Sequence, residues 1–240
     1  MKRLLLLIAF CCLPAWSQCP TTSVSLGGGF TCVISHQGSG GSGSQTVTYS
    51  GGHTAGDVIV VVGSGNFSGS SWVLGNIANT LSYTWVAAQT GCAGASQGIY
   101  AWKTVVPSTT ATSDTITLTN ANYSFIIENS FEISGSSGVL DGTGAYGTSG
   151  SGSGSFSFGS TSLPIGTGVG SATQAAGTGW TAIGFTSASP YSVSEYISPG
   201  GTSANATFTG AAYTCAIGFA LKPTAAATCT PTPQLGVSPC

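Results

Sequence analysis

Apolar and polar side chains alternate along residues 123–135, YSFIIENSFEISG. Because a β-strand has a side-chain period of two, the apolar residues share one face: Phe125, Ile127, Phe131 and Ile133. The opposite face is polar and carries Glu128, Ser130 and Glu132. The segment therefore predicts a strand with one face in a core and the other facing outward, which restricts the chain to folds that bury one side of a sheet.

Similar alternation recurs along the chain, with Gly, Ser, Thr and Asn between the segments. Residues 57–62, DVIVVV, are apolar on both faces, which predicts a central strand covered on both sides. Residues 213–221 form the clearest alternating segment, with one apolar face made of Tyr213, Cys215, Ile217, Phe219 and Leu221. No window has helical periodicity. Many short strands separated by turn residues predict an all-β fold, a single antiparallel β-sandwich.

The chain divides into four predicted segments. Residues 1–17 are typical of a secretory signal peptide, with a basic start, an apolar run too short to span a bilayer, and small residues at Ala15 and Ser17. Residues 18–44 form a leading segment with the first strand and a Gly/Ser loop, and residues 45–223 form the β-sandwich domain. Residues 224–240 are a Thr/Pro-rich tail with two cysteines. We expect a secreted protein, extracellular or at the cell surface.

Only 4% of the residues are charged, while 41% are hydrophobic. Lys2 and Arg3 fall in the expected signal peptide, so Lys103 and Lys222 are the remaining basic residues. Two cations cannot neutralise a row of phosphates, so the composition excludes nucleic acid and an anionic membrane surface as partners. A surface of Ser, Thr, Gly and Asn has little charge repulsion between copies. This favours self-association, or a partner in an extracellular matrix or on a cell surface.

Six cysteines follow the expected signal peptide: Cys19, Cys32, Cys92, Cys215, Cys229 and Cys240. An even number of cysteines in a secreted chain predicts disulfides. Cys32 and Cys215 both lie on apolar strand faces and could pair across the core, while Cys229 and Cys240 could close a small loop. There is no CxxC motif or Cys/His cluster, so we expect no zinc site and no other cofactor.

The order of the segments resembles a known architecture: GDVIVVV, YTWVAAQTG, IYAWK, DTITLT, FIIENSFEISG, LDGTG, SEYISPGG, ATFTG and YTCAIGFALKP. Over about residues 46–223, it is similar to a jelly-roll-like β-sandwich domain common in large secreted and surface proteins of bacteria. The resemblance implies a jelly-roll topology and a role in extracellular adhesion, scaffolding or sugar binding. It brings no shared catalytic constellation, and fold alone does not fix function.

Glu128 and Glu132 suggest one enzymatic alternative. They match the ends of the Glu-x-Asp-x-Glu strand of jelly-roll glycoside hydrolases of the laminarinase and lichenase type, in which the first Glu is the nucleophile and the last is the acid. Ser130 stands where that pattern has Asp. Cα atoms four residues apart on a strand are separated by roughly 13 Å, whereas the two carboxylates of a retaining enzyme lie ~5–5.5 Å apart. We therefore prefer the interpretation that both acids lie on a solvated or loop-covered face.

Three further patterns suggest other sites. Calcium prefers several oxygen ligands, which three acids could supply: Glu132, Asp141 and Glu195. A Ser-His-Asp site could use His36 or His53, although the chain has no GxSxG motif. The tryptophans could stack on sugar rings or pack inside the sandwich: Trp72, Trp85, Trp102 and Trp180.

These observations predict a secreted, non-catalytic β-sandwich protein with a structural or adhesive role. Edge strands with small polar side chains and no charged residues can add to the sheet of a neighbouring copy, so self-assembly into an extracellular filament or matrix is the expected mechanism. The first alternative is a carbohydrate-binding module with a polysaccharide partner. The second is a glycoside hydrolase that uses Glu128 and Glu132.

Overall fold

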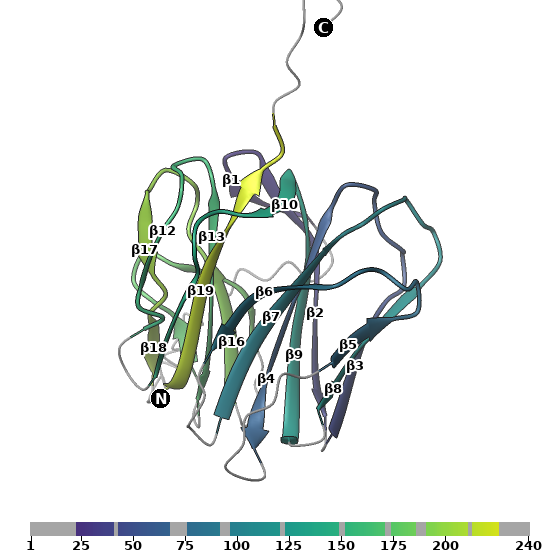
Figure 1. The fold of residues 1–240 in the computed structure, drawn as a ribbon, viewed down its shortest axis with the longest axis horizontal. Helices are drawn as coiled ribbons and strands as arrows, with labels where there is room; N and C mark the ends of the chain where they lie inside the picture. The colour runs from purple at the N-terminus through teal and green to yellow at the C-terminus, as the bar shows by residue number, and fades with distance from the viewer. Residues whose placement is uncertain are drawn as a thin grey trace, which may run out of the picture.

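The computed structural model describes residues 23–40, 43–67, 76–91, 97–120, 123–148, 152–170, 174–185, 191–210 and 213–225. Every regular element in these ranges is a β-strand, and the strands form several antiparallel sheets (Figure 1). The predicted all-β fold is confirmed. In this part of the chain there is no helix long and apolar enough to cross a membrane.

The central sheet has six strands in the order β1-β2-β9-β4-β7-β6. Their bounds are β1 Val24–Gly27, β2 Phe30–Gly40, β9 Tyr123–Ser134, β4 Val58–Phe67, β7 Gln97–Val105 and β6 Val86–Gly91. Strands β2 and β4 flank β9, so that Gly38 and Gly63 both lie opposite Glu128. The long strand β9, predicted from its alternation, is therefore in the middle of the molecule.

A second large sheet packs against one face of the central sheet. Its order is β10-β19-β13-β16-β15, and β11 also pairs with β19. The bounds are β10 Ser136–Leu140, β19 Tyr213–Pro223, β13 Leu163–Gly170, β16 Tyr191–Tyr196, β15 Thr181–Phe185 and β11 Ala145–Thr148. The buried side chains between the two sheets form the largest apolar core, which includes Val60, Phe131, Ile133, Ile217 and Phe219.

A three-stranded sheet, here called the covering sheet, lies over part of the opposite face of the central sheet. It is formed by β3 Gly43–Tyr49, β8 Asp114–Asn120 and β5 Asn76–Asn79, in the order β3-β8-β5. A second apolar core lies beneath it and includes Tyr49, Ile59, Val61, Trp102 and Ile116. Figure 1 shows the three layers side by side, with the central sheet between the other two.

Two short strand pairs cover the outer face of the second sheet. They are β12 Ser155–Ser157 with β17 Ser203–Asn205, and β14 Gln174–Ala176 with β18 Phe208–Gly210. A third apolar cluster lies beneath them and includes Phe156, Trp180, Val193, Phe208 and Ala216. On β19 these outer residues alternate with residues of the main core, because successive side chains of a strand point to opposite faces.

The layered arrangement explains why β4 is apolar on both faces. Val58, Val60 and Val62 pack toward the second sheet, while Ile59 and Val61 pack toward the covering sheet. The predicted central, doubly covered strand is confirmed. The molecule thus has more layers than a simple two-sheet sandwich, and the jelly-roll strand order remains a prediction.

One prediction about β9 is wrong. The strand does alternate, but its polar face does not face outward: Glu128 and Glu132 are only 0% and 2% exposed. The covering sheet lies over this face, and two of its strands, β3 and β5, come from residues far from β9 in the sequence. A second difference concerns the predicted Gly/Ser loop, because β2 and β3 extend into it and Gln37 and Gly38 pair with β9.

Candidate functional site: a buried acid–histidine cluster

The most polar buried region lies between the central sheet and the covering sheet, around His53. This residue follows β3 and precedes β4, and its backbone pairs with that of Thr110 through two hydrogen bonds. The side chain is inside the protein, with the residue only 3% exposed. We use the name His53 cluster for His53, Asp57, Asp114 and Glu132, all of which are buried.

The imidazole of His53 joins the two sheets through two carboxylates. Its Nδ1 lies 2.8 Å from Glu132 Oε2 on β9, and its Nε2 lies 3.2 Å from Asp114 Oδ2 on β8. Both ring nitrogens are thus engaged, and a doubly protonated imidazole can donate to both acids at once. Charge-assisted hydrogen bonds of this kind are stronger than neutral ones.

Asp114 also organises the turn after β5. Its Oδ2 accepts a hydrogen bond from Asn79 Nδ2 at 2.7 Å, and its Oδ1 accepts from Thr80 Oγ1 at 2.7 Å and from Leu81 N at 3.3 Å. A fully buried carboxylate needs such donors, because an ionised group without partners is costly to bury. Asp114 therefore connects the covering sheet, the turn and the imidazole.

Glu132 and Asp57 complete the cluster. The second carboxylate oxygen of Glu132, Oε1, accepts a hydrogen bond from Thr54 N at 3.2 Å. Burial raises the pKa of Asp57 to about 6, and the charge of Glu132 and a hydrogen bond with it act in the same direction. Like charges disfavour a second ionisation nearby, so Asp57 holds a proton at mildly acidic pH.

Opposing effects act on His53. Burial lowers its pKa, but the hydrogen bonds and negative charges of Glu132 and Asp114 outweigh burial, so the pKa is raised above the ordinary histidine value. The geometry favours the imidazolium form, because each ring N–H then faces an acid oxygen.

Aromatic rings surround the imidazole. The ring centroid of Tyr49 lies 4.8 Å from that of His53 and 4.4 Å from that of His36, and the Tyr83 ring lies 5.8 Å from His53. The Tyr49 hydroxyl makes a short hydrogen bond with the Ser130 hydroxyl of β9. Burial lowers the pKa of His36, and the neighbouring charge of His53 lowers it further.

Glu128 lies on the same face of β9 but outside these contacts. Neither of its carboxylate oxygens has a hydrogen-bond partner among the described residues. Burial raises its pKa well above the ordinary value, so it is held protonated. Both Glu128 and Glu132 are buried beneath the covering sheet rather than in an open cleft. The hydrolase alternative requires both carboxyl groups to reach a substrate.

The structure does not bring together the three acids of the calcium alternative. Glu132 bonds His53, whereas Asp141 accepts hydrogen bonds from Gly159 N and Ser162 Oγ and lies 3.7 Å from Lys222 Nζ. Glu195 is on β16, where its Oε2 accepts from Gly177 N at 2.9 Å. Within the described ranges, no group of three His, Cys, Asp or Glu residues is arranged to hold a metal.

The Ser-His-Asp alternative also lacks the required contacts at His53. The two ring nitrogens of His53 face carboxylates, and the hydroxyl of Ser130 forms a hydrogen bond with Tyr49 instead. His36 lies opposite Ser130 in the sheet register, and its buried Nε2 has no hydrogen-bond partner among the described residues. The geometry of the cluster is therefore that of an ion-pair bridge, in which one imidazole joins two carboxylates.

The tryptophans and cysteines fall into two groups. Trp102 and Trp180 are buried, Trp85 is partly buried against the second apolar core, and Trp72 lies outside the described residues. Cys32 and Cys215 are both fully buried in the main core. The other four candidates lie outside the described residues: Cys19, Cys92, Cys229 and Cys240.

Cys32 lies on β2 of the central sheet and Cys215 on β19 of the second sheet, and both side chains belong to the same apolar core. The pairing of Cys32 with Cys215 remains a prediction.

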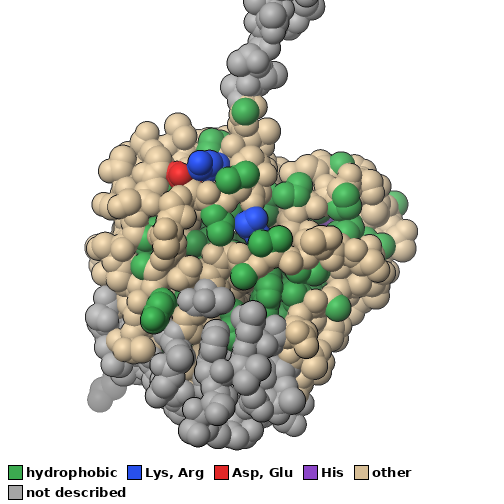
Figure 2. All heavy atoms as spheres, in the orientation of Figure 1, with side chains coloured by type: hydrophobic (Ala, Val, Ile, Leu, Met, Phe, Trp, Pro, Cys, Tyr) green, Lys and Arg blue, Asp and Glu red, His purple; other side chains and the backbone are tan. Residues whose placement is uncertain are grey.

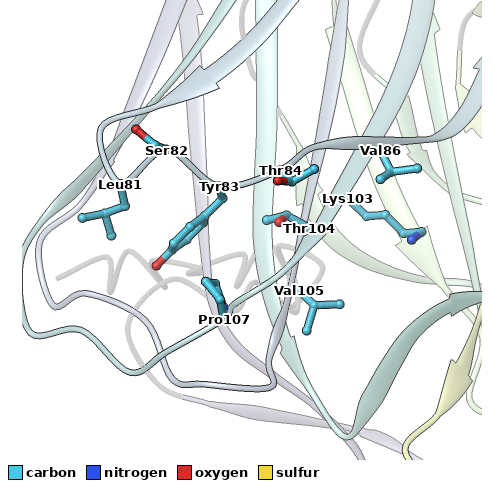
Figure 3. Close-up of a pocket in the computed structure, with 9 residues that line it drawn as sticks. All are labelled: Leu81, Ser82, Tyr83, Thr84, Val86, Lys103, Thr104, Val105 and Pro107. Carbon is cyan, nitrogen blue, oxygen red and sulfur yellow. The ribbon is translucent and has the colours of Figure 1, made fainter.

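One pocket of about 380 Å³ lies beside the segment that Asp114 anchors (Figure 3). It is lined by Leu81, Ser82, Tyr83, Thr84, Val86, Lys103, Thr104, Val105 and Pro107. Burial lowers the pKa of Lys103. The walls are a mixture of apolar and hydroxyl-bearing side chains, and no acid lines the pocket.

Sequence reasoning singled out Glu132 and His53 separately but missed Asp57, Asp114 and Tyr49 as their neighbours. The sequence offered one signal for these residues, namely the small number of charged side chains. In a chain with only 4% charged residues, each charge is expected to have a specific environment. Comparisons with protein-family models, with curated proteins and with solved structures find no match. The fold and the site define an all-β protein of layered antiparallel sheets with a buried ion-pair bridge.

Proposed function

We propose that this protein is a secreted, non-catalytic structural or adhesive subunit that acts by associating with its own copies outside the cell. The observation that supports this most directly is the position of the charges. Five of the six acidic residues are buried: Asp57, Asp114, Glu128, Glu132 and Glu195. The sixth, Asp141, lies beside Lys222.

The described surface is therefore almost free of net charge. Figure 2 shows one face on which a single acidic group lies beside a basic one, with a second basic group nearer the centre and neutral and hydrophobic side chains over most of the other described surface. Net charge keeps ordinary soluble proteins apart, and its absence promotes association. Interfaces between copies of such a surface would depend on backbone hydrogen bonds and apolar contacts.

The edge strands support the same proposal. The strands at the ends of the three largest described sheets are β1 and β6, β10 and β15, and β3 and β5. None of these six strands contains Lys, Arg, Asp, Glu or Pro. Proteins that avoid edge-to-edge pairing place such residues on their edges. Val86 on β6 is also 52% exposed, so this edge presents an apolar side chain.

The test is sedimentation and negative-stain microscopy of the oxidised chain from residue 18 onward, over a range of concentrations. We expect oligomers or fibres. Val86→Lys in β6 or Thr181→Lys in β15 should reduce assembly severalfold at whichever edge forms the contact. Ser108→Lys adds the same charge in an exposed loop and should leave assembly unchanged. A wild-type protein that stays monomeric at high concentration would contradict self-association.

Disulfides form part of this proposal. Cys32 and Cys215 are buried in the core of an expected extracellular chain, where oxidising conditions favour disulfides.

Carbohydrate binding is the second candidate function, favoured by the 60% exposure of Tyr146. Aromatic rings on a surface can stack on sugars. Titration of a monomer with polysaccharides, followed by tryptophan fluorescence, distinguishes this function.

A further inference from the structure

We propose that the His53 cluster is a proton-dependent latch that holds the covering sheet onto the central sheet. The inference does not depend on self-association. It rests on the position of the cluster between two layers that are otherwise joined largely by apolar side chains. Among the described residues, the ion pairs of His53 are the ones that join these two sheets, because the remaining pair links Asp141 and Lys222.

The latch has one cation among several acids. The titratable groups that face His53 come from each element packed around it: Glu132 of β9, Asp114 of β8, Asp57 before β4, Tyr49 of β3, Tyr83 after β5 and His36 of β2. His36 does not share the positive charge, since burial and the charge of His53 both lower its pKa. Burial also raises the pKa of Tyr49, which keeps its hydroxyl neutral.

Loss of one proton breaks one side of the bridge. Imidazolium donates from both ring nitrogens, whereas neutral imidazole has a single N–H. After deprotonation, either Glu132 or Asp114 faces a nitrogen lone pair inside the protein. A buried carboxylate without its counter-charge is strongly unfavourable. The unpaired acid then favours states in which the covering sheet moves away and water enters.

The direction of the pH effect follows from this geometry. The folded-state pKa of His53 is raised, so its stabilising contribution is complete below the ordinary histidine pKa and is lost as pH rises through the folded value. The folded-state pKa of Asp57 is raised to about 6, so its protonated form likewise contributes stability that is lost as pH rises toward that value. The latch is therefore closed in mildly acidic solution and loosens toward neutral and alkaline pH.

Opening would affect a defined part of the molecule. Asp114 holds β8 and the turn at Asn79–Leu81 through its hydrogen bonds, so both should loosen together. The face of the central sheet with Glu128 and the second apolar core would become accessible to water. The second sheet packs on the other face of the central sheet through the main apolar core and should keep its packing.

Hydrogen–deuterium exchange of the full chain, measured by mass spectrometry, tests the latch. Rates at about pH 5.5 and about pH 7.5 are corrected for intrinsic exchange. We expect amides of β3 and β8 to lose protection by roughly tenfold at the higher pH, while those of β19 change little. Equal protection of β8 at both pH values would overturn the proposal.

Two variants separate the latch from a general pH effect. His53→Gln removes the titrating cation, so the covering sheet should show low protection at both pH values, without the pH step. His36→Gln removes the other histidine and should retain the step. A step that persists in His53→Gln, or that disappears only in His36→Gln, would contradict the assignment.

A measurement on the wild-type protein covers the case in which His53→Gln does not fold. Titration of the two imidazoles by NMR should give a pKa above the ordinary value for His53 and below it for His36. Asp114→Asn keeps the amide oxygen as an acceptor but removes the charge, so the pKa of His53 should fall and the exchange step should move to lower pH. A His53 pKa at or below the ordinary value in the wild type would overturn the latch.

Discussion

At the scale of single residues, burial raises the pKa of several carboxyl groups, so that they keep their protons in the folded protein. Glu195 is the clearest case. It is fully buried on β16, and burial raises its pKa to about 8, although hydrogen bonds from the backbone of Gly177 and Thr207 partly oppose the shift. The folded protein thus keeps a proton that the unfolded chain releases near the ordinary glutamate pKa. Stability is therefore lost as pH rises between these two values.

Glu195→Gln should remove this dependence. The amide has nearly the same shape and can still accept the hydrogen bond of Gly177 N, but it cannot ionise. We expect the variant to match the wild type within about 1 kcal/mol at acidic pH. Relative to the wild type, it should gain up to about 1.4 kcal/mol for each pH unit between about 5 and 8.

Urea unfolding of both proteins at several pH values measures this difference. Asp141→Asn provides a control of opposite sign. The Ser162 hydroxyl and the Gly159 amide hold the pKa of Asp141 below its usual range, so Asp141 stabilises the fold only after it ionises. Parallel pH profiles for the wild type and Glu195→Gln would show that Glu195 is ionised at neutral pH, contrary to our expectation.

At the scale of secondary-structure elements, glycines set how closely the outer strand pairs approach the second sheet. Gly168 of β13 lies beneath the Phe208 ring of β18, and a Cβ atom at position 168 would lie 2.7 Å from Phe208 Cδ2. That separation is shorter than a carbon–carbon contact allows. Gly168→Ala should therefore displace the ring and destabilise the protein by about 1–3 kcal/mol, as overpacking usually does.

Thermal or urea unfolding of Gly168→Ala tests this packing. Gly51→Ala is the matched control, because no atom lies within 4 Å of the added Cβ and the backbone there is not left-handed. We expect almost no change in the control. If both variants lost the same stability, the effect would come from the glycine backbone rather than from Phe208.

The elements also show what a sequence can predict. The alternation along β9 and the two apolar faces of β4 could be predicted from the sequence, because the side-chain period of a strand depends only on neighbouring residues. The burial of Glu128 and Glu132 could not be predicted from the sequence, because a polar strand face does not indicate whether another layer covers it. The acids that bind His53 lie 79 and 61 residues away in the sequence, and nothing local in the pattern pairs them.

At the scale of the whole molecule, the buried titratable groups act mainly in one direction. Burial raises the pKa of Asp57, Glu128 and Glu195, and the acids around His53 raise its pKa as well. Each of these shifts makes the folded state hold protons that the unfolded chain has released. Among the described residues, His36, Lys103 and Asp141 act the other way. The sum predicts a protein that is most stable in mildly acidic solution.

The surface predicts a second property of the whole molecule. Salt screens interactions between exposed charges and affects buried pairs much less. Because the described acids are buried or paired, ionic strength should change the melting temperature by no more than about 2 °C, whereas a change from about pH 5 to about pH 8 should lower it by several degrees. Calorimetry over a grid of pH and salt measures both. A melting temperature that followed salt more strongly than pH would mean that exposed charges control stability. The neutral surface that underlies the proposed self-association would then have to be abandoned.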